Sequence, residues 1–264
     1  MIRTITQTTV SWKGRQVPTE ATSPGEIARR IDQFRADAAG AADAPAMLVL
    51  PGGAYGRHAP HEGAPVASWL TSLGIHAFVF SYPVAPARHP APVRAAAAAL
   101  AWIRGGAHGL PVDPGRVGVI GFSAGGHLAA SLCAGPAGDR PDRCVLGYPV
   151  ISFVRQPHDG CSRNLLGPGP GDAARHEVSV EEHVDDRHPP TFLWHTAADD
   201  AVPAGHSLSY AAALVARGVP VDLHVFAEGR HGLGLVDRPD DAHLDARRWT
   251  SLCESWLSAA GWTP

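Results

Sequence analysis

The hydrophobic residues of this chain gather in short runs that alternate with longer helix-like segments. Each run is rich in Val, Ile and Phe and almost continuously apolar, which is typical of strands buried on both faces of a parallel sheet. These predicted strands are Met47–Leu50, His76–Tyr82, Val117–Phe122, Cys144–Tyr148, Thr191–His195 and Val221–Phe226. The segments between them predict helices at Gly63–Leu73, Pro92–Ile103, Gly126–Cys133, Ser207–Arg217 and Asp241–Ala260.

This alternation predicts an α/β fold, with a mostly parallel central sheet and helices on both of its faces. The length of 264 residues fits one sheet, so we expect a single domain over residues 1–264. At the N-terminus, Thr4–Val10 alternates polar and apolar residues as an antiparallel edge strand does.

The segment Ile151–His188 interrupts the alternation of strands and helices with Gly-Pro-Gly-Pro-Gly and acidic residues. It predicts an irregular insertion with one short helix over the C-terminal edge of the sheet, or else a plain solvated crossover.

Composition narrows the class of protein. Hydrophobic residues make up 45% of the chain and charged residues 18%, which is ordinary for a globular protein. The net charge of −3 gives no basic surface for nucleic acid. Met1–Lys13 lacks the apolar core of a secretory signal, and no apolar stretch approaches the ~20 residues of a membrane span. We therefore predict a cytoplasmic protein with no nucleic-acid or membrane partner, and the sequence leaves homo-oligomer formation open.

The cysteines and histidines give no sign of a metal site. The four cysteines lack Cys-x-x-Cys spacing, so we expect free thiols at Cys133, Cys144, Cys161 and Cys253. Most of the 15 histidines have no carboxylate or cysteine cluster near them in the sequence. We expect structural or surface roles for His58, His61, His89, His127, His195 and His206.

The most informative motif is Gly121-Phe-Ser123-Ala-Gly125. It follows an apolar strand and opens an apolar helix, which is the context that a Gly-x-Ser-x-Gly nucleophile turn requires. The glycines leave room where strand and helix pack closely, and the sharp turn lifts the serine hydroxyl above the sheet. Ser123 is therefore the candidate nucleophile.

A serine hydroxyl needs a histidine to take its proton and a carboxylate to orient that histidine. In α/β-hydrolases these groups follow the nucleophile in the order Ser, Asp or Glu, His, on loops after later strands. Asp199 and Asp200 follow one predicted strand, and either can supply the carboxylate. His231 follows the next strand between glycines and is the candidate base.

Attack on a carbonyl places negative charge on its oxygen, which backbone N–H groups can stabilise. The amide of Ala124, directly after the nucleophile, is one expected donor. The loop Leu50-Pro-Gly-Gly-Ala-Tyr55 resembles the lipase and esterase His-Gly-Gly-Gly motif and offers the amides of Gly53 and Ala54. The alternative, a glycine-rich phosphate-binding loop, lacks the Gly-Lys-Ser/Thr that such a loop needs.

Several motifs in order resemble the bacterial acetyl esterase and acetylxylan-esterase-like α/β-hydrolases, which are related to the hormone-sensitive-lipase family. They are Pro51-Gly-Gly-Ala-Tyr, His61-Glu-Gly, Tyr82-Pro-Val-Ala-Pro, Gly121-Phe-Ser-Ala-Gly-Gly-His-Leu-Ala, Tyr148-Pro-Val-Ile-Ser, Asn164-Leu-Leu-Gly, the Asp199 turn and Gly229-Arg-His-Gly-Leu-Gly. The resemblance implies the α/β-hydrolase fold over 1–264 and selects Asp199 over Asp200. It also implies that Tyr82 supports the oxyanion loop.

The resemblance departs from the hormone-sensitive-lipase pattern at the N-terminus. Those relatives carry a sizeable helical cap, whereas only about 45 residues precede Met47 here. We therefore expect no large N-terminal cap and no long apolar tunnel. Leaving-group selectivity is assigned to the insertion at 151–188 and to the loop Tyr55–Glu62, with Tyr55 as the candidate substrate-binding residue.

These residues predict a serine carboxylic ester hydrolase that cleaves short-acyl, above all acetyl, esters through an acyl-enzyme. Its substrate would be a small-molecule or acetylated-sugar ester, and it needs no metal or cofactor. Two alternatives stay open. The same triad could serve an amidase, a peptidase or an acyltransferase, and the same fold could serve a catalytically silent binding protein.

Overall fold

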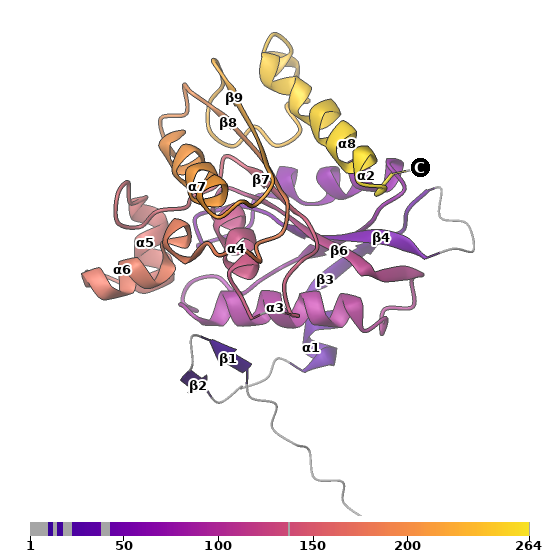
Figure 1. The fold of residues 1–264 in the computed structure, drawn as a ribbon, viewed down its shortest axis with the longest axis horizontal. Helices are drawn as coiled ribbons and strands as arrows, with labels where there is room; N and C mark the ends of the chain where they lie inside the picture. Colours follow the sequence, from indigo (N-terminus) through magenta and orange to yellow (C-terminus); the bar gives the residue numbers. More distant parts are fainter. Residues whose placement is uncertain (1–9, 13–14, 18–22, 38–42, 137, 264) are drawn as a thin grey trace, which may run out of the picture.

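The centre of the molecule is a seven-stranded sheet (Figure 1). The computed structural model describes residues 10–12, 15–17, 23–37, 43–136 and 138–263. Strands β4 to β9 are parallel, and β3 pairs antiparallel with β5 at the sheet edge. In spatial order the strands are β3 (Ile31–Phe34), β5 (His76–Phe80), β4 (Ala44–Leu50), β6 (Val112–Phe122), β7 (Cys144–Gly147), β8 (Thr191–Thr196) and β9 (Val221–Phe226). The predicted fold class is confirmed.

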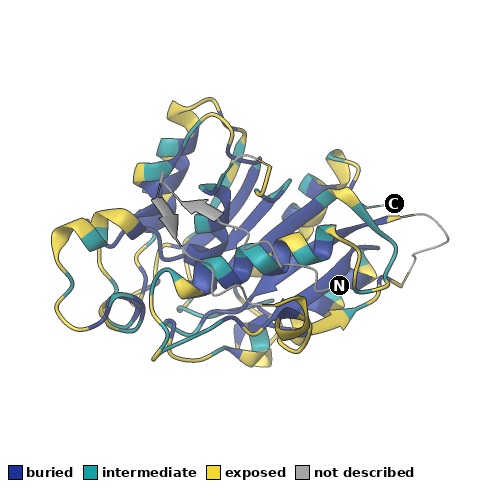
Figure 2. Ribbon diagram, turned by 90° about the horizontal axis from the view of Figure 1, so that it is seen from below, coloured by how far each residue is buried: buried dark blue, intermediate teal, exposed yellow. Residues whose placement is uncertain are grey.

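Helices cover both faces of the sheet, and each face has its own hydrophobic cluster. Successive strand residues point to opposite faces, so Leu48 and Leu50 join one cluster while Met47 and Val49 join the other. One face carries α1 (Pro24–Ala28), α3 (Ala91–Arg104), α4 (Ala124–Cys133) and α7 (Gly205–Ala216). The other carries α2 (Ala64–Ser72) and α8 (Trp249–Ala259). Figure 2 shows the strands buried beneath helices whose outer sides are exposed.

The structure bears on the predictions about the cysteines and about membrane spans. All four cysteines are buried free thiols, as predicted. None of the described helices combines the length and the apolar character that a membrane crossing requires.

Most of the predicted N-terminal strand lies outside the described residues, and the C-terminal helix differs from its prediction. The edge strand is β3, while residues 4–9 of the predicted Thr4–Val10 strand lie outside the described residues; β1 (Val10–Trp12) and β2 (Arg15–Val17) form a separate antiparallel pair. The predicted helix Asp241–Ala260 is shorter, because α8 begins only at Trp249. Two 3-10 turns, Pro239–Asp241 and Asp245–Arg248, precede it.

The segment 151–188 contains more helix than the single short one predicted. It folds into α5 (Asp159–Leu166), α6 (Asp172–Val178) and a 3-10 turn, Val180–His183. His158 begins α5 by accepting a hydrogen bond from the Cys161 amide at 3.1 Å. Cys161 and Leu165 then bury against the core. Helices this short have too few apolar positions for a clear 3.6-residue period.

The register of the strands brings the loops of the predicted site together. Leu50 at the end of β4 pairs with Gly121 near the end of β6, so the loop after β4 starts beside Ser123. Farther along the sheet, Thr196 at the end of β8 pairs with Phe226 at the end of β9. The loops that carry Asp199 and His231 therefore leave the sheet side by side.

The contact between β4 and α4 leaves no room for a side chain at Gly125, whose added Cβ would overlap the carbonyl oxygen of Leu50. We expect Gly125→Ala to lower the free energy of unfolding by about 1–3 kcal/mol or more, because an overpacked core must shift. Denaturant unfolding measures this change. Gly171→Ala is the matched control, since no atom lies within 4 Å of its added Cβ. Equal stability of the two variants would contradict the close packing.

Candidate active site

The Gly-x-Ser-x-Gly segment forms a strained turn between β6 and α4. Ser123 has φ of 53° and ψ of −119°, a region that residues other than glycine rarely adopt. A Cβ on Gly121 would overlap the carbonyl oxygen of Gly125, so the two glycines allow the turn to close. The turn directs the Ser123 hydroxyl toward His231.

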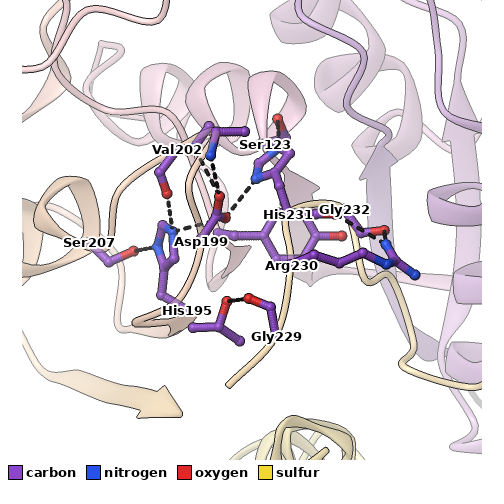
Figure 3. A network of polar contacts seen from close by, with 12 residues as sticks. Ser123, His195, Asp199, Val202, Ser207, Gly229, Arg230, His231 and Gly232 are labelled. Atoms are coloured by element: carbon purple, nitrogen blue, oxygen red, sulfur yellow. Dashed lines mark hydrogen bonds and ion pairs between the residues drawn. The ribbon is translucent and has the colours of Figure 1, made fainter. Parts of the chain in front are cut away.

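The three predicted triad residues meet above the ends of β6, β8 and β9 (Figure 3). Nε2 of His231 lies 2.8 Å from the Ser123 hydroxyl, and Nδ1 lies 2.7 Å from Oδ2 of Asp199. A carboxylate can only accept, so Nδ1 carries the proton and Nε2 accepts from the serine. Asp200 is exposed, whereas Asp199 is buried. The geometry therefore selects Asp199, as the resemblance implied.

Asp199 remains a carboxylate although it is buried. Oδ1 accepts hydrogen bonds from the amides of Ala201 and Val202 at 3.1 and 2.9 Å. Burial raises the pKa of Asp199, but hydrogen bonds from His195 and His231 outweigh this effect and hold the pKa well below its usual range. The negative charge that orients His231 is thus kept at neutral pH.

His195 is a supporting residue whose hydrogen-bond partners the sequence did not reveal. It is fully buried and lies between the Ser207 hydroxyl, 2.7 Å from Nδ1, and the Val202 carbonyl, 2.8 Å from Nε2. Its Nε2 is also 3.4 Å from Oδ2 of Asp199. It therefore fixes the Asp199 turn from below, which fits the structural role expected for it.

The loop after β4 makes a tight turn opposite the nucleophile. Gly53, Ala54 and Tyr55 all have positive φ, of 125°, 54° and 58°. Within the described part of the chain, the amides of Gly53 and Ala54 donate to no protein acceptor. Ala124 is the first residue of α4, where backbone N–H groups lack helical partners. The backbone N–H groups of the three predicted donors are thus available to a ligand beside Ser123.

Two side chains hold the loop after β4 in this conformation. The Tyr82 hydroxyl donates to the carbonyl of Pro51 at 2.6 Å, as the resemblance implied. The Asn164 side chain, from α5, donates to the carbonyl of Ala54 at 2.9 Å. The turn conformation therefore depends on α5 as well as on the sheet.

Tyr55 is not placed for direct contact with a substrate, which corrects the sequence-based expectation. Its side chain is 1% exposed, and its hydroxyl lies 2.6 Å from Nδ1 of His127. Nε2 of His127 lies 2.7 Å from the Val178 carbonyl, so Nε2 carries the proton and Nδ1 accepts from Tyr55. The positive φ of Tyr55 turns its ring inward. The sequence-based prediction failed because backbone conformation cannot be read from residue type alone.

Glu62 is the supporting residue that sequence reasoning missed, although it stands in the His61-Glu-Gly motif. Its side chain is 2% exposed. One oxygen accepts from the Gly52 amide at 2.7 Å, and the other accepts from the Tyr148 hydroxyl at 2.7 Å. That hydroxyl in turn accepts from the Gly234 amide at 2.7 Å. Glu62 thus links the oxyanion loop to the loop of His231.

An open cleft with a volume of about 360 Å³ leads to Ser123. Small-molecule sites have comparable volumes, of roughly 300–1,000 Å³. Besides Ser123 and His231, the cleft is lined by Gly53, Ala54, Arg57, Ala59, His61, Glu62, His158, Arg230, Gly232 and Arg238. No cluster of His, Cys, Asp or Glu that could hold a metal ion occurs among the described residues.

Comparison with known proteins places the chain in a family. Residues 97–253, more than half of the chain, match the model of the prolyl oligopeptidase family, and residues 34–140 match the BD-FAE model. The chain belongs to the prolyl oligopeptidase family. An acetyl ester-xyloside bifunctional hydrolase from Caldicellulosiruptor lactoaceticus is 41% identical to this family member, with a TM-score of 0.82 and 89% of both chains covered. The resemblance to bacterial acetyl esterases is thereby confirmed.

Other relatives of this prolyl oligopeptidase-family chain include two esterases and a xylanase. The carboxylesterase Cest-2923 from Lactobacillus plantarum is 28% identical, with a TM-score of 0.73, covering 89% of this chain and 93% of that one. The acetylxylan esterase of Xylanibacter ruminicola is 30% identical over 72% of this chain and 41% of its own length. Endo-1,4-beta-xylanase B of Butyrivibrio fibrisolvens is 35% identical over 72% of this chain. The chain spans about a third of that protein's length.

The buried Glu62 should matter more for catalysis than for substrate binding. In Glu62→Gln the amide NH₂ cannot accept from the Gly52 amide or from the Tyr148 hydroxyl, so one of these two hydrogen bonds is lost or reversed and the link between the two loops is disturbed. We expect kcat to fall about 10- to 100-fold, because misplaced groups stabilise the transition state poorly. Steady-state kinetics on p-nitrophenyl acetate measure this fall in kcat. The substitution Glu254→Gln, at an exposed position, is the control. A rise in KM at unchanged kcat would contradict this role.

His127 should make the folded state sensitive to acid. Burial lowers its pKa to about 4, whereas the unfolded chain has the ordinary pKa near 6.5. Below about pH 6.5 the unfolded chain therefore binds a proton that the folded chain does not, so the free energy of unfolding falls until about pH 4. His206, whose pKa burial also lowers to about 4, adds to the slope.

Urea unfolding at about pH 7 and about pH 5 measures this slope. His127→Gln should flatten it, whatever the stability of the variant at neutral pH. The exposed His243→Gln is the control and should keep the full slope. A slope in His127→Gln as steep as in the unchanged protein would contradict the assignment.

Proposed function

We propose that this protein is a serine carboxylic ester hydrolase that removes short acyl groups, above all acetyl, through an acyl-enzyme. One observation carries the proposal: the hydrogen-bonded chain from Ser123 through His231 to Asp199 opens onto a cleft beside backbone amides without protein acceptors. The similarity to an acetyl ester-xyloside bifunctional hydrolase, which covers 89% of both chains, supports this reading.

In the first half of the reaction, the Ser123 oxygen attacks the ester carbonyl while Nε2 of His231 takes its proton. The imidazolium that forms is stabilised by the Asp199 carboxylate at Nδ1. The amides of Gly53, Ala54 and Ala124 are the proposed donors to the carbonyl oxygen as it gains negative charge. Collapse of this intermediate breaks the ester bond, and Nε2 returns the proton to the leaving alcohol.

In the second half, a water molecule enters where the alcohol left. His231 removes a proton from this water, which attacks the acyl carbon, and the same amides stabilise the second tetrahedral intermediate. Nε2 then protonates Ser123 as the acid leaves. Because no step requires electron transfer or a metal-bound water, we propose that the protein acts without a cofactor.

The walls of the cleft favour a small acyl group. Among the described residues that line it, the only alkyl side chains are the methyl groups of Ala54 and Ala59. A long acyl chain would bury little apolar surface there, so each added methylene would contribute far less than the ~0.8 kcal/mol of full burial. We propose acetate as the preferred acid.

Ser123→Ala should lower kcat/KM on p-nitrophenyl acetate by roughly 10⁴-fold or more, because the residual rate would come only from binding and the oxyanion donors. It should also abolish labelling by a serine-directed phosphonate. Ser255→Ala, on the exposed side of α8, is the matched control. Continued labelling of the Ser123 variant would contradict the assignment of the nucleophile.

An acyl series from acetate to octanoate, with matched anilides, tests the reaction class. We expect the highest kcat/KM on the acetyl ester, with anilides cleaved far more slowly. A preference for octanoate would refute the short-acyl proposal. Anilides cleaved as fast as esters would instead indicate an amidase.

A further inference from the structure

The cleft that leads to Ser123 is unusually cationic for a protein of net charge −3. Arg57, Arg230 and Arg238 all line it and all are exposed, while Glu62 is its only carboxylate among the described lining residues. The Glu62 side chain is only 2% exposed, and both of its oxygens accept hydrogen bonds from inside the protein. The lining of the cleft therefore carries three guanidinium groups and, among the described lining residues, no exposed carboxylate.

The three arginines differ in their partners. Arg230 donates to the carbonyls of His231 and Gly232 and forms an ion pair with Asp241 at 2.9 Å. Its charge is largely compensated within its own loop. In the part of the chain that the structure describes, the guanidinium groups of Arg57 and Arg238 have neither an ion pair nor a hydrogen bond to the protein. These two keep all five N–H donors for a ligand.

Arg57 and Arg238 belong to two different loops that line the cleft. Arg57 closes the oxyanion turn, where its amide donates to the carbonyl of Gly53 at 3.2 Å. Arg238 lies seven residues after His231, on the loop that follows the catalytic histidine. In the proposed mechanism Nε2 of His231 hands its proton to the departing alcohol. The alcohol portion therefore lies beside His231, in the cleft that Arg238 also lines.

We propose that the alcohol part of the natural ester carries an anionic group, a carboxylate or a phosphate, which Arg238 and Arg57 bind. This inference rests on the proposed esterase function and extends it to the class of alcohol. An acetylated acidic sugar combines the small acyl group with such a charge. Arginine suits both anions, because its planar fork donates two parallel hydrogen bonds to carboxylate or phosphate oxygens.

A matched pair of esters isolates the charge. The probes are 4-acetoxybenzoate and its neutral methyl ester, which share the acetyl group and the aromatic ring, with rates divided by those of hydroxide hydrolysis. We expect corrected kcat/KM to favour the anionic ester by about tenfold or more, as charge-assisted hydrogen bonds in a cleft allow. Added salt should reduce this preference, because the arginines are exposed. A third probe, 4-acetoxyphenyl phosphate, distinguishes a phosphate from a carboxylate preference.

Substitution then assigns the preference to residues. In the double variant Arg57→Gln and Arg238→Gln, the ratio of anionic to neutral kcat/KM should fall to about one, and Lys at both positions should retain part of it. Arg217→Gln, at the exposed C-terminal end of α7, is the control and should keep the ratio.

Each outcome decides between the two proposals. Hydrolysis of the neutral ester without preference for either anion would overturn the anionic alcohol and leave the esterase proposal standing. An equal loss on both esters in the double variant would also overturn it, since the arginines would then act on the shared acetyl group. Failure to hydrolyse any of the three esters would contradict the esterase function and this inference together.

Discussion

The site depends on backbone packing between the loop after β4 and the start of α4. A Cβ on Gly52 would lie 2.9 Å from the Cβ of Ser123, and one on Gly125 would overlap the Leu50 carbonyl oxygen. With no side chain between them, the two segments stay in contact. The distance from Ser123 to the proposed oxyanion donors is therefore set by rigid backbone rather than by side-chain rotamers, as a preorganised site requires.

Buried polar groups fix the residues whose backbone is strained at this contact. Ser123, Ala54, Tyr55 and Tyr148 have positive φ although they are not glycines, and all four lie in or against the site. Such conformations cost energy and persist only where the surroundings fix them. Here the Glu62 carboxylate fixes the oxyanion loop on one side and, through Tyr148, the histidine loop on the other. One buried charge thus maintains the alignment of segments that lie far apart in the sequence.

Much of this arrangement could be predicted from the sequence, because its signals are local. Apolar runs located the parallel strands, and the order of Ser123, Asp199 and His231 along those strands predicted their meeting. The structure differs from the prediction at residues whose conformation depends on long-range contacts. Tyr55 turns inward because of its positive φ, α5 forms around a histidine cap, and Glu62 gains its partners only when Gly52 and Tyr148 come together. No period or motif spacing reports such pairings.

In the proposed mechanism the amides of Gly53, Ala54 and Ala124 face the position of the developing oxyanion. A crystal structure of the protein after reaction with a small phosphonate tests this placement, because the bound phosphonyl oxygen stands in for that oxyanion. We expect a covalent bond to the Ser123 oxygen and a phosphonyl oxygen about 2.7–3.1 Å from these amides. A phosphonyl oxygen that points into the open cleft, away from all three amides, would contradict it.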